Sequence, residues 1–407
     1  MKKLVLSIFT AFFSLCALAQ KDNKVTIGSI DSIQSKILNE QRKIWVYVPS
    51  SWTPESKQRY PVLYLLDGND HFYSTVGIIQ HLSQGIGNTI CPEMIVVGIP
   101  NTDRIRDLTP THVDAAPPFT DSLMLKTTGG GERFVSFIEK ELIPHIDSLY
   151  PTQSYKILTG HSFGGLTVMN VAINHTKLFN SYICIDPSMW WDQMNLLNKT
   201  RNSLRENKFS GTTLYLGIAN TLREGMEITK VRSDTTKGTR HIRSILNLDQ
   251  YIKEQKQNGL RYESKYYSNE DHGSVPLIAE YDALRFIFDK YRFKLTPKDL
   301  TDPTVDLVGK FERHYQEVSK LLDYKLSPPE DMINELGGDF LQRKEYAKAE
   351  GLFKLNVANY PESYTVYDSY GDYFLAMGNK SKAIEYFKKA LSIKENPGSR
   401  KKLNTLL

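Results

Sequence analysis

The chain has 407 residues, which is enough for one large domain and a smaller one. With 40% hydrophobic and 24% charged residues, its composition is ordinary for a soluble globular protein. The net charge of +5 is small for this length, and no run of lysine and arginine is interleaved with aromatic residues. Composition and charge therefore argue against a nucleic-acid-binding protein.

The N-terminus predicts a secretory signal peptide over residues 1–19. An apolar run at residues 4–15 follows two lysines and precedes an A-x-A cleavage pattern, and it is too short to span a bilayer. Cys16 would suggest a lipid-anchored protein, but Leu15 stands where that pattern needs a small residue. We therefore expect an exported protein, periplasmic or extracellular, whose mature chain begins at Gln20.

From residue 25 to about 292, strand-like and helix-like segments follow one another. Apolar runs predict strands at residues 44–48, 62–66, 94–99, 155–158, 182–185, 213–218 and 262–267. Helical patterns lie between most of the later runs, for example at residues 134–149, 241–257 and 277–291. The run at 62–66 is apolar throughout, as expected of a strand buried on both faces. The pattern predicts an α/β fold whose doubly wound, mostly parallel sheet begins with an antiparallel edge.

The C-terminal residues 331–407 repeat with a period of 34. The repeat aligns Gly337 with Gly371, Phe340 with Phe374, Ala349 with Ala383, and Phe353 with Phe387. This period, with small and aromatic residues where two helices pack, predicts a small all-α domain of two tetratricopeptide-like repeats. A generic helical bundle is the alternative.

Two further segments complete the predicted domain organisation. Residues 295–304 contain two prolines among charged residues and predict a linker. A helix at 308–324 follows and is expected to cap the repeats, as is the end segment at 399–407. The predicted parts are a catalytic domain over 20–292, a linker with a capping helix over 293–330, and the repeats.

The most informative segment predicts a strand, a sharp turn and a helix, with Ser162 at the turn. Gly160 and Gly164 flank this serine in the G-x-S-x-G pattern of a nucleophile elbow. Glycine is needed there because the strand and helix backbones pass close to the serine. The turn exposes the hydroxyl and places the next N–H, that of Phe163, at a helix start. Ser162 is therefore the predicted nucleophile, and Phe163 the first oxyanion donor.

His272 is the predicted general base. A serine hydroxyl needs a positioned base, which in such a fold comes from the loop after the last strand. The predicted strand at 262–267 is followed by a polar loop that contains His272. The other histidines lack this position, because His161 flanks the serine, and His175 and His241 lie in predicted helices.

An acidic residue is expected to hold the tautomer of the base. The loop after the strand at 213–218 offers Glu224 and Glu227, and Asp234 lies further along. Asp186, after the preceding strand, is another alternative. Glu227 is the preferred candidate, and the other three stay open.

Four motifs in this chain resemble the esterase D and enterochelin-esterase-like branch of the α/β-hydrolases. They are Leu65-Leu66-Asp67-Gly68, Gly160-His161-Ser162-Phe163-Gly164-Gly165, Pro187-Ser188-Met189-Trp190-Trp191 and Asp271-His272-Gly273-Ser274. That branch includes siderophore esterases, feruloyl and acetyl carbohydrate esterases, and mycolyltransferases. The resemblance covers about residues 25–292 and implies that the N–H of Asn69 is the second oxyanion donor. Some siderophore-type relatives use a Ser–His dyad, so the resemblance leaves the third member open.

Two residues are predicted to bind substrate. Trp190 follows the sixth strand, at the carboxyl edge where such sheets bind ligands. Arg104 and Arg106 follow the fourth strand, where an arginine suits an anionic acyl group such as a catecholate. Arg106 is the preferred candidate, and a surface ion pair with a neighbouring aspartate is the alternative.

These predictions describe a secreted serine ester hydrolase that needs no metal or organic cofactor. The expected substrate is a small-molecule or glycan ester, such as a siderophore ester or an acylated carbohydrate. An acyltransferase would use the same site. A non-catalytic scaffold that binds a protein partner through the repeats is the remaining alternative.

Overall fold

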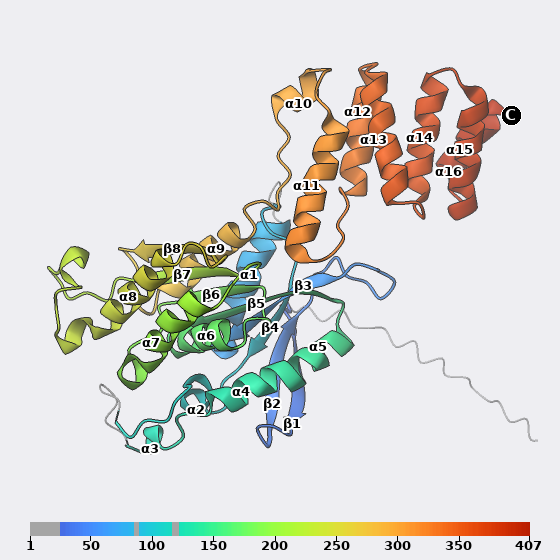
Figure 1. The fold of residues 1–407 in the computed structure, drawn as a ribbon. Helices are drawn as coiled ribbons and strands as arrows, with labels where there is room; N and C mark the ends of the chain where they lie inside the picture. The colour runs from blue at the N-terminus through green and yellow to red at the C-terminus, as the bar shows by residue number, and fades with distance from the viewer. Residues whose placement is uncertain (1–24, 85–88, 116–121) are drawn as a thin grey trace, which may run out of the picture.

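The computed structural model describes residues 25–84, 89–115 and 122–407, so the predicted signal peptide lies outside the described part. A helix-flanked sheet forms the first part of the molecule, and a row of helices forms the C-terminal part (Figure 1). No helix in the described ranges is long and apolar enough to span a membrane.

The sheet has eight strands in the order β1-β2-β4-β3-β5-β6-β7-β8. The strands are β1 Ser29–Ser35, β2 Glu40–Tyr47, β3 Tyr60–Leu66, β4 Ile95–Ile99, β5 Thr152–His161, β6 Ser181–Ile185, β7 Thr213–Ala219 and β8 Arg261–Tyr267. The first two strands pair antiparallel, β2 pairs antiparallel with β4, and the strands from β4 to β8 run parallel. The predicted fold class is confirmed, including its antiparallel edge.

Helices cover both faces of this sheet because its central strands are buried on both sides; every residue of β3 and of β7 is buried. One face packs against α1 Gly68–Gln84 and α9 Val275–Ile287. The other face packs against α4 Gly131–Phe137, the π-helix Ile138–Leu142, α5 Ile143–Leu149, α6 Phe163–Asn174, α7 Trp191–Glu206 and α8 Arg240–Glu254. Two short helices, α2 Arg104–Leu108 and α3 Ser122–Leu125, follow β4.

The C-terminal part consists of helical hairpins, and two of them contain the same glycine–phenylalanine contact. Its helices are α11 Leu307–Leu322, α12 Glu330–Gln342, α13 Tyr346–Asn359, α14 Tyr364–Ala376, α15 Lys380–Ile393 and α16 Pro397–Leu406. A Cβ added at Gly337 would lie 2.7 Å from the ring of Phe353, and one added at Gly371 would lie 2.6 Å from Phe387. Both pairs join the first helix of a hairpin to its second, one period apart. The all-α domain is thus present, and the tetratricopeptide-like identity of its repeats stays a prediction.

The segment predicted as a linker contains a short helix, α10 Pro297–Thr301. Proline is tolerated in the first turn of a helix, and Thr296 and Asp299 form a capping box that stabilises this end. Leu295 and Leu300 pack against the apolar core of the C-terminal helices. Local proline content therefore did not prevent this segment from packing.

Helix α11 connects the two parts of the molecule (Figure 1). Its Val318 and Leu322 are buried in the same apolar cluster as Ile287 and Phe288 of the sheet domain. The Ser154 hydroxyl, near the start of β5, donates to the carbonyl of Asp323 at 3.2 Å. The C-terminal helices thus dock at the amino ends of the strands, whereas Ser162 lies at the carboxyl end of β5.

Candidate active site

Ser162 occupies a strained turn between β5 and α6, with φ of 60° and ψ of −113°. Two backbone hydrogen bonds of 3.0 Å hold it there, from its own N–H to the carbonyl of Ile185 and from the N–H of Ser188 to its carbonyl. A Cβ at Gly160 would lie 2.6 Å from the backbone of Gly164, so the turn closes only with glycine. This geometry is the one that the G-x-S-x-G pattern predicts.

His272 lies in the loop between β8 and α9, and its Nε2 is 3.1 Å from the Ser162 Oγ. That distance is within reach for proton transfer from the hydroxyl. The His272 side chain is 42% exposed, so the ring is open to solvent on one side. The structure therefore brings together the two residues that the sequence predicted as nucleophile and base.

Asp186, directly after β6, is the carboxylate that contacts His272. Its Oδ2 is 2.6 Å from Nδ1 of His272, and its Oδ1 accepts the N–H of Ala219 at 3.0 Å. Complete burial alone would raise the pKa of Asp186, but hydrogen bonds from His241 and His272 hold that pKa below its ordinary value. An ionised carboxylate at Nδ1 favours the tautomer whose Nε2 accepts the serine proton.

Glu227, the preferred candidate for the acid, lies elsewhere. Its side chain is 67% exposed, and its carboxylate contacts Thr229 at 3.3 Å and Lys230 at 3.6 Å. Asp234 is also on the surface, where it caps the backbone of Thr236. The loop after β7 turns outward, so the preference for Glu227 is corrected in favour of Asp186, one of the alternatives.

His241, the second residue of α8, is a neighbour that the sequence analysis set aside as helical. Its Nε2 lies 2.8 Å from Oδ2 of Asp186, the oxygen that also faces His272. The two imidazole rings are 5.1 Å apart and nearly perpendicular, at 89°. Only the fold could reveal this contact, because 55 residues separate His241 from Asp186 along the chain.

Hydrogen bonds are enough to explain the close spacing of this cluster. Asp186, His241 and His272 are the one group of histidine, cysteine or acidic residues among the described residues whose donor atoms are spaced closely enough for a metal ion. Each of the two nitrogen atoms already hydrogen-bonds the carboxylate, at 2.8 Å and 2.6 Å. These hydrogen bonds satisfy the polar groups without an ion.

The predicted oxyanion donors begin two helices. The N–H of Phe163 is in the first turn of α6, and that of Asn69 is in the first turn of α1, and backbone N–H groups at helix starts suit a negative charge. A Cβ at Gly68 would lie 2.6 Å from the backbone of Ile99, so only glycine lets α1 begin this close to β4. Both helix starts therefore lie at the carboxyl edge of the sheet, beside the nucleophile.

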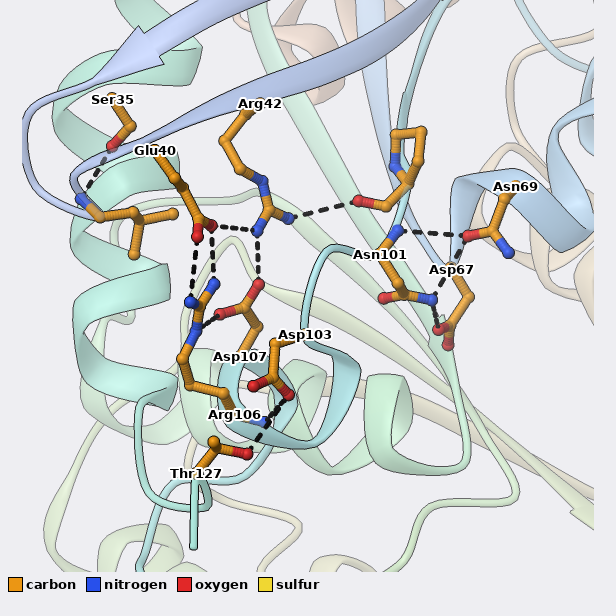
Figure 2. A network of polar contacts seen from close by, with 12 residues as sticks. Ser35, Glu40, Arg42, Asp67, Asn69, Asn101, Asp103, Arg106, Asp107 and Thr127 are labelled. Atoms are coloured by element: carbon orange, nitrogen blue, oxygen red, sulfur yellow. Dashed lines mark hydrogen bonds and ion pairs between the residues drawn. The ribbon is translucent and has the colours of Figure 1, made fainter. Parts of the chain in front are cut away.

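Asp67 contacts several residues around the loop before α1, of which Asn101 is drawn in Figure 2. Arg104 forms two hydrogen bonds to the buried Asp67 carboxylate, at 2.6 Å and 3.0 Å. The Asn101 amide adds a third at 2.7 Å, and its backbone N–H donates to the Asn69 side chain at 3.2 Å. The guanidinium of Arg104 also lies over the ring of Phe163 at 5.6 Å. Arg104 thus connects the two helix starts.

Arg106, the predicted substrate-binding arginine, is engaged elsewhere (Figure 2). It pairs with Glu40 through both Nη atoms, at 3.0 Å and 2.6 Å, and with Asp107 through Nε at 2.7 Å. The buried Arg42 joins the same network through Asp107 at 2.6 Å. These partners raise the pKa of Arg106 and engage all three of its guanidinium nitrogen atoms. The structure is closer to the alternative prediction, an ion pair of Arg106 with a neighbouring aspartate, although this ion-pair network is partly buried.

Trp190 lines a pocket of about 400 Å³ together with His112, Asp114, Gln193 and Arg240. Its indole ring packs beside Phe163 at 6.1 Å and beneath the guanidinium of Arg240 at 4.8 Å. Trp191 is fully buried and donates its indole N–H to the carbonyl of Thr111 at 3.1 Å. One tryptophan therefore faces the pocket while the other packs in the core, because adjacent side chains point in different directions.

The chain matches the family model described as Putative esterase over residues 35–243. The ferri-bacillibactin esterase of Bacillus subtilis is 28% identical over 65% of this chain and 91% of its own length. The siderophore enterobactin esterase of Emericella nidulans is 26% identical over 56% of this chain and 82% of its own length.

Solved structures extend the likeness beyond the sheet domain. An IroE-like serine hydrolase from Shewanella oneidensis is 30% identical, covers 81% of this chain and 98% of its own, and has a TM-score of 0.67. A protein from Capnocytophaga ochracea covers 93% of this chain and 99% of its own with a TM-score of 0.62, at 18% identity. The second match shows that the fold, including most of the C-terminal helices, recurs.

Proposed function

Because the chain belongs to the Putative esterase family of ester hydrolases, we propose that it is a serine esterase acting through Ser162, His272 and Asp186. The observation that carries this proposal is the continuous chain of hydrogen bonds from the hydroxyl of Ser162 through the imidazole of His272 to the carboxylate of Asp186, at 3.1 Å and 2.6 Å.

The proposed reaction proceeds through an acyl-enzyme. The Oγ of Ser162 attacks the ester carbonyl while Nε2 of His272 takes its proton. The N–H groups of Phe163 and Asn69 bind the negative oxygen of the tetrahedral intermediate, and Asp186 stabilises the imidazolium. His272 then protonates the departing alcohol. A water molecule, deprotonated by the same imidazole, attacks the acyl-enzyme and releases the acid.

A siderophore ester is the proposed substrate class. The relatives named above are esterases of bacillibactin and enterobactin. In this chain, the pocket beside Trp190 combines an aromatic ring with the cationic Arg240. An aromatic surface and a guanidinium suit a planar, anionic acyl group such as a catecholate. The predicted signal peptide supports action in the periplasm or outside the cell.

Ser162→Ala tests the function. The variant should lose about 10⁴-fold or more of its turnover, because the nucleophile is absent. Wild type and variant are to be assayed with catecholate siderophore esters, feruloyl and acetyl carbohydrate esters, and p-nitrophenyl esters. Circular dichroism verifies that the variant is folded. A folded variant that keeps a tenth of the wild-type activity would refute the assignment.

A further inference from the structure

Asp186 is a fully enclosed charge. The residue is 0% exposed, and it meets the rest of the protein through three donors. One is the backbone N–H of Ala219 on Oδ1, and the other two are imidazole nitrogen atoms of His241 and His272 on Oδ2. Removing a donor from a buried carboxylate is costly, because no water replaces the lost hydrogen bond.

The two imidazoles at Oδ2 differ in their surroundings and in their proposed task. His272 is in a loop, is 42% exposed and must exchange protons with Ser162. His241 is in α8, where its neighbours Ile242 and Ile245 are buried in the core and its carbonyl accepts the Ser244 hydroxyl at 2.7 Å. His241 is thus anchored on a packed helix, whereas His272, the proposed base, lies in a loop.

The backbone of Asp186 has a φ of +40°, which residues other than glycine rarely adopt, so surrounding contacts must offset the strain of holding the residue there. Without His241, the carboxylate would keep Ala219 on Oδ1 but only His272, the base itself, on Oδ2. No contact independent of the base would then hold Oδ2 in place. A second N–H on Oδ2 supplies such a contact and shares the negative charge.

We propose that His241 is a positioning residue that acts through Asp186: its Nε2–H holds the carboxylate in the orientation that fixes the Nδ1–H tautomer of His272. The inference presupposes the proposed serine-esterase mechanism. It assigns His241 no contact with substrate. A system with two histidines on one buried aspartate keeps its base aligned even though that base lies in an exposed loop.

Other charged and titratable groups surround the same site. From β5, the ring of His161 lies 4.4 Å from that of His272, and His71 of α1 lies 6.0 Å from His161. Burial, then the neighbouring His272, lowers the pKa of His161 to about 3, so it remains neutral near neutral pH. Asp67 and Arg104 neutralise one another on the far side of His161. None of these groups donates to Asp186.

The test compares two replacements of His241 in the full chain. His241→Phe keeps a ring of similar size but removes the N–H, whereas His241→Gln retains an amide N–H near the position of Nε2. We expect His241→Phe to lower kcat about 10-fold or more with KM little changed. The acid limb of its kcat/KM profile should move to higher pH, because a less neutralised Asp186 favours the imidazolium of His272. His241→Gln should restore most of kcat and the wild-type profile.

Long-range proton–nitrogen NMR of histidine side chains separates this inference from the proposed function. It reports whether His272 holds its proton on Nδ1, whatever the turnover. In wild type and His241→Gln we expect the Nδ1–H tautomer, and in His241→Phe a mixture. Wild-type kcat, pH profile and tautomer in His241→Phe would overturn the inference, as would equal losses in both variants. An inactive wild type with the expected tautomers would refute the esterase and leave the positioning role standing.

Discussion

Two members of the proposed triad, Ser162 and Asp186, have strained backbones, with φ angles of 60° and 40°. Such conformations cost about 1–3 kcal/mol each outside glycine, so the surrounding contacts must offset that cost. The N–H of Ser162 donates to Ile185 at 3.0 Å, and that of Asp186 donates to Gly217 at 2.8 Å. Neighbouring strands thus hold both reacting side chains at the carboxyl edge of the sheet.

Asp186→Asn and Glu227→Gln form a matched pair at the residue scale. An amide at 186 removes the negative charge and allows the wrong tautomer of His272, so turnover should fall about 10³- to 10⁴-fold. Glu227→Gln should leave turnover within about two-fold of wild type, because its carboxylate is on the surface. Steady-state kinetics on an aryl ester measures both. A large loss in Glu227→Gln with a normal Asp186→Asn would reinstate the original preference.

The sequence was enough to predict that Ser162 and His272 share one site, because each follows a strand in a local pattern, and the structure brings the two side chains together. It was not enough to choose the acid. Asp186 and Glu227 both follow predicted strands, and only the path of the loop after β7 separates them. The contact of His241 with Asp186 was harder still to predict, since it depends on the start of α8 lying beside the residue that follows β6. These contacts are long-range, and no local pattern encodes them.

At the scale of elements, the interface between α1 and α9 contains a buried acid, Glu280. Its Oε2 accepts the Thr75 hydroxyl at 2.7 Å, and its Oε1 has no hydrogen-bond partner among the described residues. Burial raises the pKa of Glu280 to about 7. The folded protein therefore retains a proton that the unfolded chain releases near pH 4.3.

Glu280→Gln should consequently change the pH dependence of stability. Because the folded-state pKa is raised, the neutral Glu280 carboxyl makes its full contribution to the free energy of unfolding below about pH 4. That contribution, roughly 3 kcal/mol, is lost as the pH rises through 7. The amide does not ionise and avoids this loss. We expect the Tm of the variant to exceed that of wild type by more at pH 8 than at pH 5. An equal Tm difference at both pH values, measured by calorimetry, would contradict the buried neutral acid.

The helical hairpins offer a second test at this scale. Gly371→Ala places a methyl group 2.6 Å from the Phe387 ring, and such overpacking costs about 1–3 kcal/mol. Gly338→Ala is the control, because nothing lies within 4 Å of its Cβ and alanine favours the helix by up to about 1 kcal/mol. Chemical denaturation should show destabilisation in the first variant and none in the second. Equal effects would argue against close packing of α14 on α15.

Elements with clear patterns were predicted and weakly patterned ones were not. The seven apolar runs correspond to strands, whereas β1 has no apolar run that would predict it, because most of its residues are exposed at the edge of the sheet. The short α10 was predicted as linker because its prolines outweighed Leu295 and Leu300. Their packing against the C-terminal helices depends on residues distant in the sequence.

At the scale of the whole molecule, the proposed catalytic residues and the C-terminal helices lie at opposite ends of the strands of the sheet. Ser162, Asp186 and His272 follow the carboxyl ends of β5, β6 and β8. The amino ends face α11, and a cavity of about 580 Å³ lies between the two parts, lined by residues such as Tyr60, Tyr291 and Tyr360. The C-terminal helices therefore have no direct contact with the triad, and their influence on small substrates should be limited to stability.

Two shortened chains distinguish α11 from the helices beyond it. A chain ending after Ser327 keeps α11, whose Val318 and Leu322 are buried against Phe288. A chain ending after Arg292, the predicted domain boundary, removes both side chains from that cluster, at a cost of about 3–5 kcal/mol.

We expect the longer chain to hydrolyse small aryl esters within a few-fold of full length at a similar Tm. The shorter chain should unfold at a clearly lower Tm yet keep its kcat where it is folded, because the strands that carry the triad are intact. If the two chains were equally stable, α11 would belong to the helical domain alone; if the longer one were folded but inactive, the helices beyond α11 would contribute to the site.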